Sequence, residues 1–149
     1  YEAILKSMLS VGHRIPKKNI LISSGPTRSK VELLNSTRML IEKGYNIYST
    51  AGTAKFFKEN GIDTQILYWP DEDKEPNIME YLHDRKIDLV INIPKNHTKR
   101  ELDNGYRIRR AAVDYNIPLI TNARLASAFI YAICKVDPTE IAIKSWDEY

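Results

Sequence analysis

The sequence is poor in the residues that build disulfides and metal centres. It contains one cysteine, Cys134, and three histidines, His13, His83 and His97. A single cysteine excludes an internal disulfide, and such sparing use fits a reducing compartment, so we expect a cytoplasmic protein. The histidines lack the short spacing of a metal site, and we therefore expect no bound metal.

Long apolar runs and a strong charge of one sign are also missing. No run approaches the roughly 20 apolar residues that span a bilayer. The 22 Lys and Arg residues outnumber the 19 Asp and Glu residues only slightly, giving a formal charge of +3. This excess is too small to indicate nucleic-acid binding. The motifs GxxxxGK[ST], GxGxxG and paired CxxC do not occur. We expect neither a membrane nor a nucleic acid as partner.

A length of 149 residues is most simply one domain with a real apolar core. Within it, compact apolar runs alternate with stretches of helical spacing. We predict strands at residues 19–23, 45–49, 64–69, 88–93 and 118–121. We predict helices at residues 2–11, 29–44, 52–61, 78–86, 106–116 and 122–136, and a polar, basic loop at 94–105. The alternation predicts a three-layer α/β/α fold of Rossmann-like type around a five-stranded parallel sheet.

In such sheets, ligands bind beyond the carboxyl ends of the strands. The segment YSTAGTAKFF, residues 48–57, turns there from strand to helix and carries Thr50, Gly52 and Thr53. The threonines could cap the helix, or the free N–H groups at its start could hold an anion. Lys30 lies in the first turn of the preceding helix and would supply positive charge. We expect a phosphate or carboxylate ligand.

Other strand ends carry further candidates. Trp69 follows the third strand and suits either core packing or a pocket wall, and Asn92 is an amide inside an apolar strand that must find partners. Asp71 and Asp73 are conceivable general bases, although nothing nearby singles out either one. The arginines of YRIRR, residues 106–110, suit an exposed face. The loops therefore indicate binding of an anion rather than its chemical conversion.

At this point several stretches carry a family resemblance: STAGTAKFFKENGI, DLVINIP, NGYRIRRAAVDYNIPLITN and the leading KSMLSVGHRIPKKNILIS. Together they resemble the methylglyoxal-synthase-like domain, and most closely the carboxy-terminal allosteric domain of carbamoyl phosphate synthetase large chains. The resemblance extends from about residue 4 to residue 136. It implies that residues 1–18 are a helix and linker from the synthetase body, 19–136 the effector-binding domain and 137–149 a tail. The chain starts at Tyr1, and we expect it to be a piece of a longer polypeptide.

The resemblance also implies roles for single residues. In bacterial members, a lysine after the first strand and the two threonines of a TxGT motif hold the phosphate of a nucleotide. Those positions are Lys30, Thr50 and Thr53 here. An asparagine at the end of the fourth strand matches Asn92. The bacterial pattern has a second lysine where this chain has Trp69, which is similar to the animal enzymes instead.

In the acetylglutamate-activated type, the matching tryptophan, threonines and asparagines line the pocket. Asn92 and Asn104 match two of those asparagines, whereas Lys95 replaces a third, and that type lacks the lysine that matches Lys30. The segment GYRIRRAAVD is closest to the animal pyrimidine-pathway type, which responds to UTP and phosphoribosyl pyrophosphate. We expect a uridine nucleotide as effector, with IMP or phosphoribosyl pyrophosphate as further candidates, and no cofactor or catalytic residue in this domain.

The parent enzyme implied by the resemblance makes carbamoyl phosphate from ATP, bicarbonate and glutamine or ammonia for pyrimidine and arginine biosynthesis. It uses Mg²⁺ or Mn²⁺ and K⁺, and its partners would be the rest of the large chain and a glutaminase small subunit, with self-association possible.

Three alternatives stay open. A methylglyoxal synthase acting on dihydroxyacetone phosphate carries a GGDQQ-type segment, where this chain has WPDEDKEPN. The cyclohydrolase domain of purine synthesis shares a similar glycine turn but fits GYRIRR poorly. A scaffold or interaction domain is the third.

Overall fold

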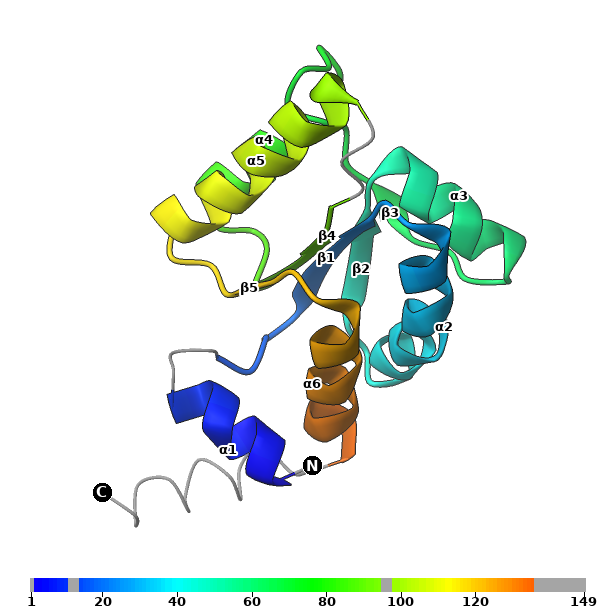
Figure 1. The fold of residues 1–149 in the computed structure, drawn as a ribbon, viewed down its shortest axis with the longest axis vertical. Coiled ribbons are helices and arrows are strands. Elements are labelled where there is room, and N and C mark those ends of the chain that lie inside the picture. The colour runs from blue at the N-terminus through cyan, green and yellow to red at the C-terminus, as the bar shows by residue number, and fades with distance from the viewer. Residues whose placement is uncertain (1, 11–13, 95–97, 136–149) are drawn as a thin grey trace.

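The computed structural model describes residues 2–10, 14–94 and 98–135, and within them five parallel strands form one sheet with helices on both faces (Figure 1). The strands are β1 (Asn19–Ser24), β2 (Asn46–Ser49), β3 (Gln65–Ile66), β4 (Leu89–Ile93) and β5 (Leu119–Ile120). The helices are α1 (Glu2–Ser10), α2 (Thr27–Glu42), α3 (Ala51–Glu59), α4 (Ile78–His83), α5 (Lys99–Asp114) and α6 (Ala123–Lys135). The predicted three-layer α/β fold is confirmed.

The strand order creates a crevice at one place in the sheet. The order is β3-β2-β1-β4-β5, and every neighbouring pair is parallel. From β1 the chain moves outward through β2 to β3, and then returns to place β4 on the other side of β1. β1 and β4 therefore flank the topological switch point, where an open α/β sheet binds its ligands.

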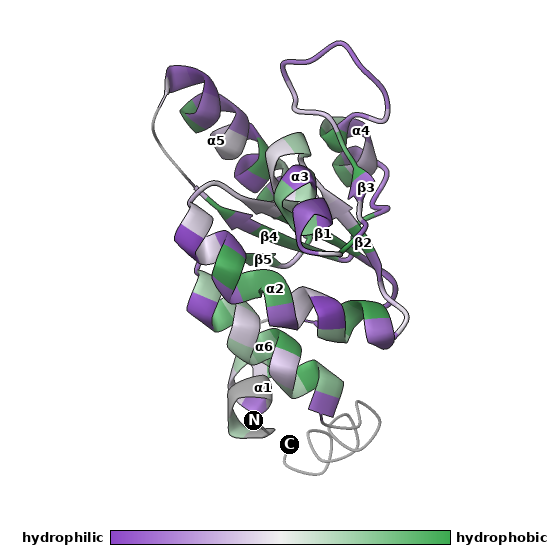
Figure 2. Ribbon diagram, turned by 90° about the vertical axis from the view of Figure 1, so that its right-hand side faces the viewer, coloured by the Kyte–Doolittle hydropathy of each residue, from purple (hydrophilic) through white to green (hydrophobic). Residues whose placement is uncertain are grey.

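Two apolar cores lie on opposite faces of the sheet because strand side chains alternate. Ile20 and Ile22 of β1 pack with α2, α3 and α6, whereas Leu21 between them packs with α4 and α5. In Figure 2 the strands are largely green, and the helices that cover them carry both green and purple residues. Cys134 is buried in the first core, as expected from its apolar helix face. None of the helices in the described part of the chain has the length and apolarity to cross a bilayer.

Two predicted helix ends are confirmed by their backbone. Gly44 follows the C-cap of α2 with φ 92°, and Gly61 follows the C-cap of α3 with φ 81°. Residues with side chains rarely adopt this left-handed conformation, so glycine suits both positions. Elsewhere, α2 begins at Thr27 rather than at residue 29, and α4 ends at His83 rather than at residue 86.

The start of α5 corrects one prediction. The loop expected at 94–105 is wrong from Lys99 onward, because the helix begins there. The Thr98 hydroxyl accepts a hydrogen bond from the Glu101 N–H at 3.1 Å, which is half of a capping box. The missed signal was this Thr-x-x-Glu spacing. Leu102, the apolar residue of this first turn, is 44% exposed. The turn therefore has no buried apolar residue whose spacing would predict a helix.

The third strand is shorter than the predicted 64–69. The Leu67 N–H still donates to the Ser49 carbonyl at 2.9 Å, but the Tyr68 N–H donates to the Pro76 carbonyl at 2.9 Å, so the chain leaves the sheet. The Asn77 side-chain amide then donates to the Trp69 carbonyl at 2.9 Å and to the Glu72 carbonyl at 3.0 Å. The loop folds around Asn77 and holds Trp69 at the crevice.

Candidate functional site

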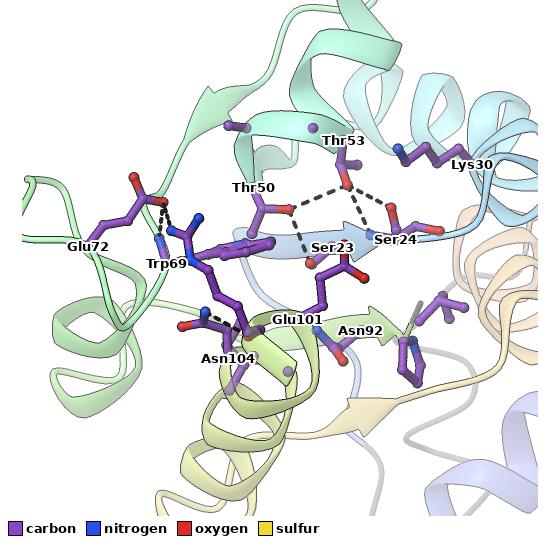
Figure 3. Close-up of a pocket in the computed structure, with 18 residues that line it drawn as sticks. Ser23, Ser24, Lys30, Thr50, Thr53, Trp69, Glu72, Asn92, Glu101 and Asn104 are labelled. Atoms are coloured by element: carbon purple, nitrogen blue, oxygen red, sulfur yellow. Dashed lines mark hydrogen bonds and ion pairs between the residues drawn. The ribbon is translucent and has the colours of Figure 1, made fainter. Parts of the chain in front are cut away.

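A cavity of about 380 Å³ opens beyond the carboxyl ends of β1 and β4 (Figure 3). Its walls come from the ends of these two strands, the first turns of α2 and α3, the first half of α5, and the loop after β3. Seven of the eight predicted site residues line it: Lys30, Thr50, Gly52, Thr53, Trp69, Asn92 and Asn104. The eighth, Lys95, lies outside the described residues. Segments that are far apart in the sequence therefore meet at one site.

The start of α3 presents backbone donors to this cavity. Thr50 occupies the N-cap position, yet its side chain makes no capping hydrogen bond. The first bond within the helix runs from the Ala54 N–H to the Thr50 carbonyl at 2.8 Å. By helix geometry, the N–H groups of Ala51, Gly52 and Thr53 have no acceptor inside the helix. The capping interpretation thus holds for the position of Thr50 but not for its hydroxyl.

Hydroxyl groups join α3 to the end of β1. Thr53 Oγ1 accepts from the Ser24 N–H at 3.0 Å and lies 3.2 Å from the Ser24 carbonyl oxygen, to which it donates. Thr50 Oγ1 lies 3.1 Å from Ser23 Oγ. Ser24 Oγ is buried and has no hydrogen-bond partner within the described part of the chain. A buried polar group of this kind calls for a partner, and a bound ligand would supply one.

Trp69 forms the rim on the other side. It is half-buried and lines the cavity rather than the core. The Arg100 guanidinium lies 5.0 Å from the centroid of its ring, which is cation–π geometry. Asp71 holds that guanidinium through contacts of 2.6 and 3.1 Å. The hydrogen bond from Arg100 lowers the pKa of the Asp71 carboxyl and raises the pKa of Arg100. Glu72 Oε1 accepts a hydrogen bond from the backbone N–H of Trp69 at 3.3 Å.

The two asparagines of the site are held differently. Asn104 Oδ1 accepts from the Asp71 N–H at 3.1 Å, and its Nδ2 donates to the Arg100 carbonyl at 3.0 Å. The Oδ1 end of this amide therefore joins α5 to the loop after β3, whereas the Nδ2 end bonds within α5. Asn92 Oδ1 accepts from Arg109 Nη1 at 2.7 Å. Its Nδ2 is left on the side of the cavity.

Sequence reasoning missed several lining residues, namely Ser23, Ser24, Glu72, Arg100 and Glu101. It also took all three arginines of 106–110 for an exposed face. This is correct for Arg107 and for Arg110, which pairs with Asp114 at 3.2 Å on the surface. It is wrong for Arg109, which is half-buried and turned toward Asn92.

Charges of both signs surround the cavity. Lys30 and Arg100 face it together with Glu72 and Glu101, and Glu72 Oε1 lies 4.0 Å from Arg100 Nη2. The starts of three helices add partial positive charge at the same edge of the sheet. Over the described ranges, no group of three or more His, Cys, Asp or Glu residues could hold a metal ion. The arrangement can therefore bind an anion through backbone donors, hydroxyls and one lysine.

Comparison with known proteins decides the family. The family model of the MGS-like domain matches residues 32–121, more than half of the chain. The chain belongs to the MGS-like domain family. The matched segment contains α3, β4 and α5, which carry most of the cavity wall.

The relatives of this MGS-like domain are parts of much longer proteins. It is 43% identical over 153 aligned residues to the multifunctional protein CAD of Squalus acanthias, covering 93% of this chain and 7% of that protein. It is 37% identical to the carbamoyl phosphate synthase large chain, C-terminal section, of Aquifex aeolicus, covering 88% of this chain and 24% of that one. It is also 37% identical to the human mitochondrial carbamoyl-phosphate synthase [ammonia], covering 91% and 9%.

A solved structure shows the same fold. Methylglyoxal synthase from Elizabethkingia anophelis NUHP1 superimposes with a TM-score of 0.54 at 17% sequence identity, covering 78% of this chain and 79% of that one. At this identity the likeness concerns the architecture of the MGS-like domain and not its chemistry.

Proposed function

We propose that this MGS-like domain is the regulatory domain of a carbamoyl phosphate synthetase large chain and binds a phosphorylated effector in the 380 Å³ cavity. The observation that carries the proposal is the convergence of three kinds of donor near the start of α3. They are its first N–H groups, which have no acceptor inside the helix, the Ser24 hydroxyl, which has no partner among the described residues, and the Lys30 ammonium group. The relatives named as carbamoyl phosphate synthases support the choice of parent enzyme.

The phosphate of the effector would sit against the first turn of α3. Hydrogen bonds from N–H groups to an ionised acceptor are roughly twice as strong as those between neutral groups. Ala51, Gly52 and Thr53 supply such N–H groups, and the absence of a side chain on Gly52 leaves the approach open. Lys30 adds a full positive charge from α2. Thr50 adds a hydroxyl that now contacts Ser23.

The rest of the effector would extend toward Trp69. Its indole offers an aromatic surface, and Arg100 stacked on the ring holds it in place. A cavity of about 380 Å³ lies within the range of roughly 300–1,000 Å³ seen for small-molecule sites. A uridine nucleotide is our first candidate, followed by IMP and phosphoribosyl pyrophosphate. Asn104 would act by holding the rim, since both ends of its amide already bond to the backbone.

The parent reaction belongs to the proposal as well. We place ATP-dependent synthesis of carbamoyl phosphate, with its metal ions and K⁺, in the rest of a longer large chain that works with a glutaminase subunit in the cytoplasm. Residues 19–136 would be the regulatory domain, with a connecting segment at 1–18 and a tail at 137–149. Effector binding changes catalysis only if the two states of the synthetase bind the effector differently, a coupling of typically about 1–3 kcal/mol.

The arrangement of Asp71 argues against methylglyoxal synthase activity. A general base must accept a proton near neutral pH. Asp71 is bound at two points by Arg100, its pKa is lowered, and it does not line the cavity. Incubation of the chain with dihydroxyacetone phosphate should therefore give no methylglyoxal above the uncatalysed rate.

A thermal-shift panel with the 149-residue chain tests the proposal. The ligands are UMP, UTP, IMP, phosphoribosyl pyrophosphate, ornithine and acetylglutamate. A ligand at 100 times its Kd adds about 2.7 kcal/mol of stability. At least one phosphorylated ligand should stabilise the chain, and Lys30→Met and Thr50→Val should reduce the shift. Lys55→Met is the matched control, because Lys55 is an exposed lysine of α3 outside the cavity wall.

The panel also separates the candidate effectors. A response to acetylglutamate alone would replace the phosphorylated effector by a carboxylate. No response to any phosphorylated ligand would overturn the phosphate site.

A further inference from the structure

The contact between Arg109 and Asn92 fixes the direction of an amide. Asn92 is 3% exposed at the end of β4, and Arg109 Nη1 lies 2.7 Å from its Oδ1. A guanidinium carries only donors, so the atom that faces it must be the carbonyl oxygen of Asn92. The orientation thus follows from chemistry and not from the usual ambiguity of side-chain amides. Asn92 Nδ2, a donor, is left on the cavity side.

This donor belongs to the proposed phosphate site at the first turn of α3, which is called the phosphate seat, or the seat, below. Asn92 and Ser23 are partners in the parallel register of β4 and β1, and paired residues point to the same face of a sheet. Ser23 Oγ in turn lies 3.1 Å from Thr50 Oγ1 at the start of α3. Asn92 therefore lies in one row with the hydroxyls of Ser23 and Thr50. If its amide turned over, the row would present a carbonyl oxygen to an anion, which is repulsive.

Gly105 makes room for this arrangement. It lies one helical turn before Arg109 on α5 and lines the cavity. A Cβ added at Gly105 would lie 2.9 Å from Arg109 Nη1, closer than real Cβ contacts, so the guanidinium would have to move. Glycine weakens a helix interior relative to alanine. Its presence at this position is explained by the space that Arg109 needs to reach Asn92.

We propose that Gly105 and Arg109 act together as an orientation lock for the Asn92 amide. The lock keeps a donor toward the seat and makes the seat selective for groups that only accept hydrogen bonds, such as phosphoryl oxygens. Gly105 and Arg109 are positioning residues that act through Asn92. The inference rests on the proposed function and adds to it the residues that set the polarity of the seat.

Calorimetric titration of the 149-residue chain with UMP, and separately with inorganic phosphate, tests the lock. Gly105→Ala and Arg109→Ala should each weaken binding about tenfold, the cost of losing a hydrogen bond to a charged group. Gly105→Ala changes no charge, so an equal loss in both variants indicates orientation rather than electrostatics. In the double variant the added Cβ displaces nothing, and affinity should equal that of Arg109→Ala alone.

Two controls separate the lock from a general structural role. Gly105→Ala should melt at the wild-type temperature or above it, since alanine favours the helix. Arg110→Ala should bind both probes within about twofold of the wild type, because Arg110 pairs with Asp114 on the surface. In ¹⁵N spectra, UMP should shift the Asn92 side-chain amide resonance of the wild type but not that of Gly105→Ala, while the backbone amide of Gly52 shifts in both.

The outcomes are distinct. Gly105→Ala binding as tightly as the wild type, or additive losses in the double variant, would overturn the lock and leave the proposed function intact. A wild type that binds neither probe would contradict the proposed function and the lock with it.

Discussion

Asp71 and Arg100 are joined at two points at the rim of the cavity, with Nε 2.6 Å from Oδ2 and Nη2 3.1 Å from Oδ1. The same guanidinium lies 5.0 Å from the centre of the Trp69 ring. A surface ion pair by itself contributes little to stability. Here it has a geometric effect, because a guanidinium fixed at two points fixes the aromatic wall beneath it.

This relationship predicts a local response to substitution. Asp71→Asn removes one ionised partner, so Arg100 should leave the Trp69 ring for part of the time. The sequence has two tryptophans, and a Trp146→Phe background makes Trp69 the sole reporter. We expect a change in Trp69 fluorescence and faster quenching by iodide, with little change in the unfolding midpoint. Asp73→Asn in the same loop is the control, and an equal response there would contradict the assignment.

The same pair gives a pH dependence of known sign. Hydrogen bonding from Arg100 lowers the pKa of Asp71 below the ordinary value of 3.8. A carboxyl with a depressed pKa stabilises the folded state above its unfolded pKa, and this contribution is lost as the pH falls through the folded pKa. Trp69 fluorescence should therefore stay constant from pH 8 to pH 5 and change only below about 3.8. Asp71→Asn should lack that transition.

Thr53 should matter for stability as well as for binding. The residue is 1% exposed, and its hydroxyl accepts a hydrogen bond from the Ser24 N–H at 3.0 Å. Thr53→Val keeps the shape but leaves this buried N–H without a partner, which costs about 1–3 kcal/mol. Urea denaturation measures the loss. Thr53→Ser keeps the hydroxyl and should recover most of it. A valine variant within about 0.5 kcal/mol of the wild type would show that another acceptor replaces Thr53.

Two adjacent phenylalanines of α3 give a matched test of the core. Phe57 is fully buried, whereas Phe56 is partly buried and packs against the same cluster. Phe57→Ala should cost about 3–5 kcal/mol, the usual range for a buried aromatic ring. Phe56→Ala should cost clearly less because its cavity would open to solvent. Equal losses in urea denaturation would mean that the two rings share the core burial equally.

Asn104 should hold the cavity rim around Asp71 and Arg100 in place without contacting the ligand itself. Its amide joins the Asp71 N–H to the Arg100 carbonyl. Asn104→Ala should accelerate hydrogen exchange at the Asp71 amide and weaken binding of the best phosphorylated ligand about tenfold. Asn104→Asp keeps the acceptor for that N–H and should preserve its protection. Unchanged exchange in the alanine variant would assign Asn104 to direct ligand contact instead.

The sequence predicted those parts of the site that are local to one strand end. Thr50, Gly52 and Thr53 lie within one turn of the end of β2, and parallel topology brings every such end to the same edge of the sheet. Asn92 was recognisable as an amide in an otherwise apolar strand. Its partner was not, because the direction of Arg109 depends on the phase of α5, whose start was predicted seven residues too late.

Other features depend on contacts that no local pattern encodes. The bond from Thr53 to Ser24 joins residues 29 positions apart, and the sequence does not reveal which of several hydroxyls forms it. The third strand is shorter than predicted because the Tyr68 N–H donates to the Pro76 carbonyl. The loop that contains both residues is held closed by the side chain of Asn77. Apolar spacing over 64–69 cannot distinguish a strand from such a turn.

The order of the strands gives the cavity a further property. Its walls come from two strand ends, parts of three helices and one loop, which the chain brings together only when β4 has returned beside β1. A ligand in this position is a reversible cross-link between segments as distant as Ser24 and Asn104. Ligand binding therefore stabilises the whole domain rather than one element. It should also slow local opening of the sheet between β1 and β4. Hydrogen exchange in these two central strands should report occupancy of the cavity as faithfully as the lining residues do.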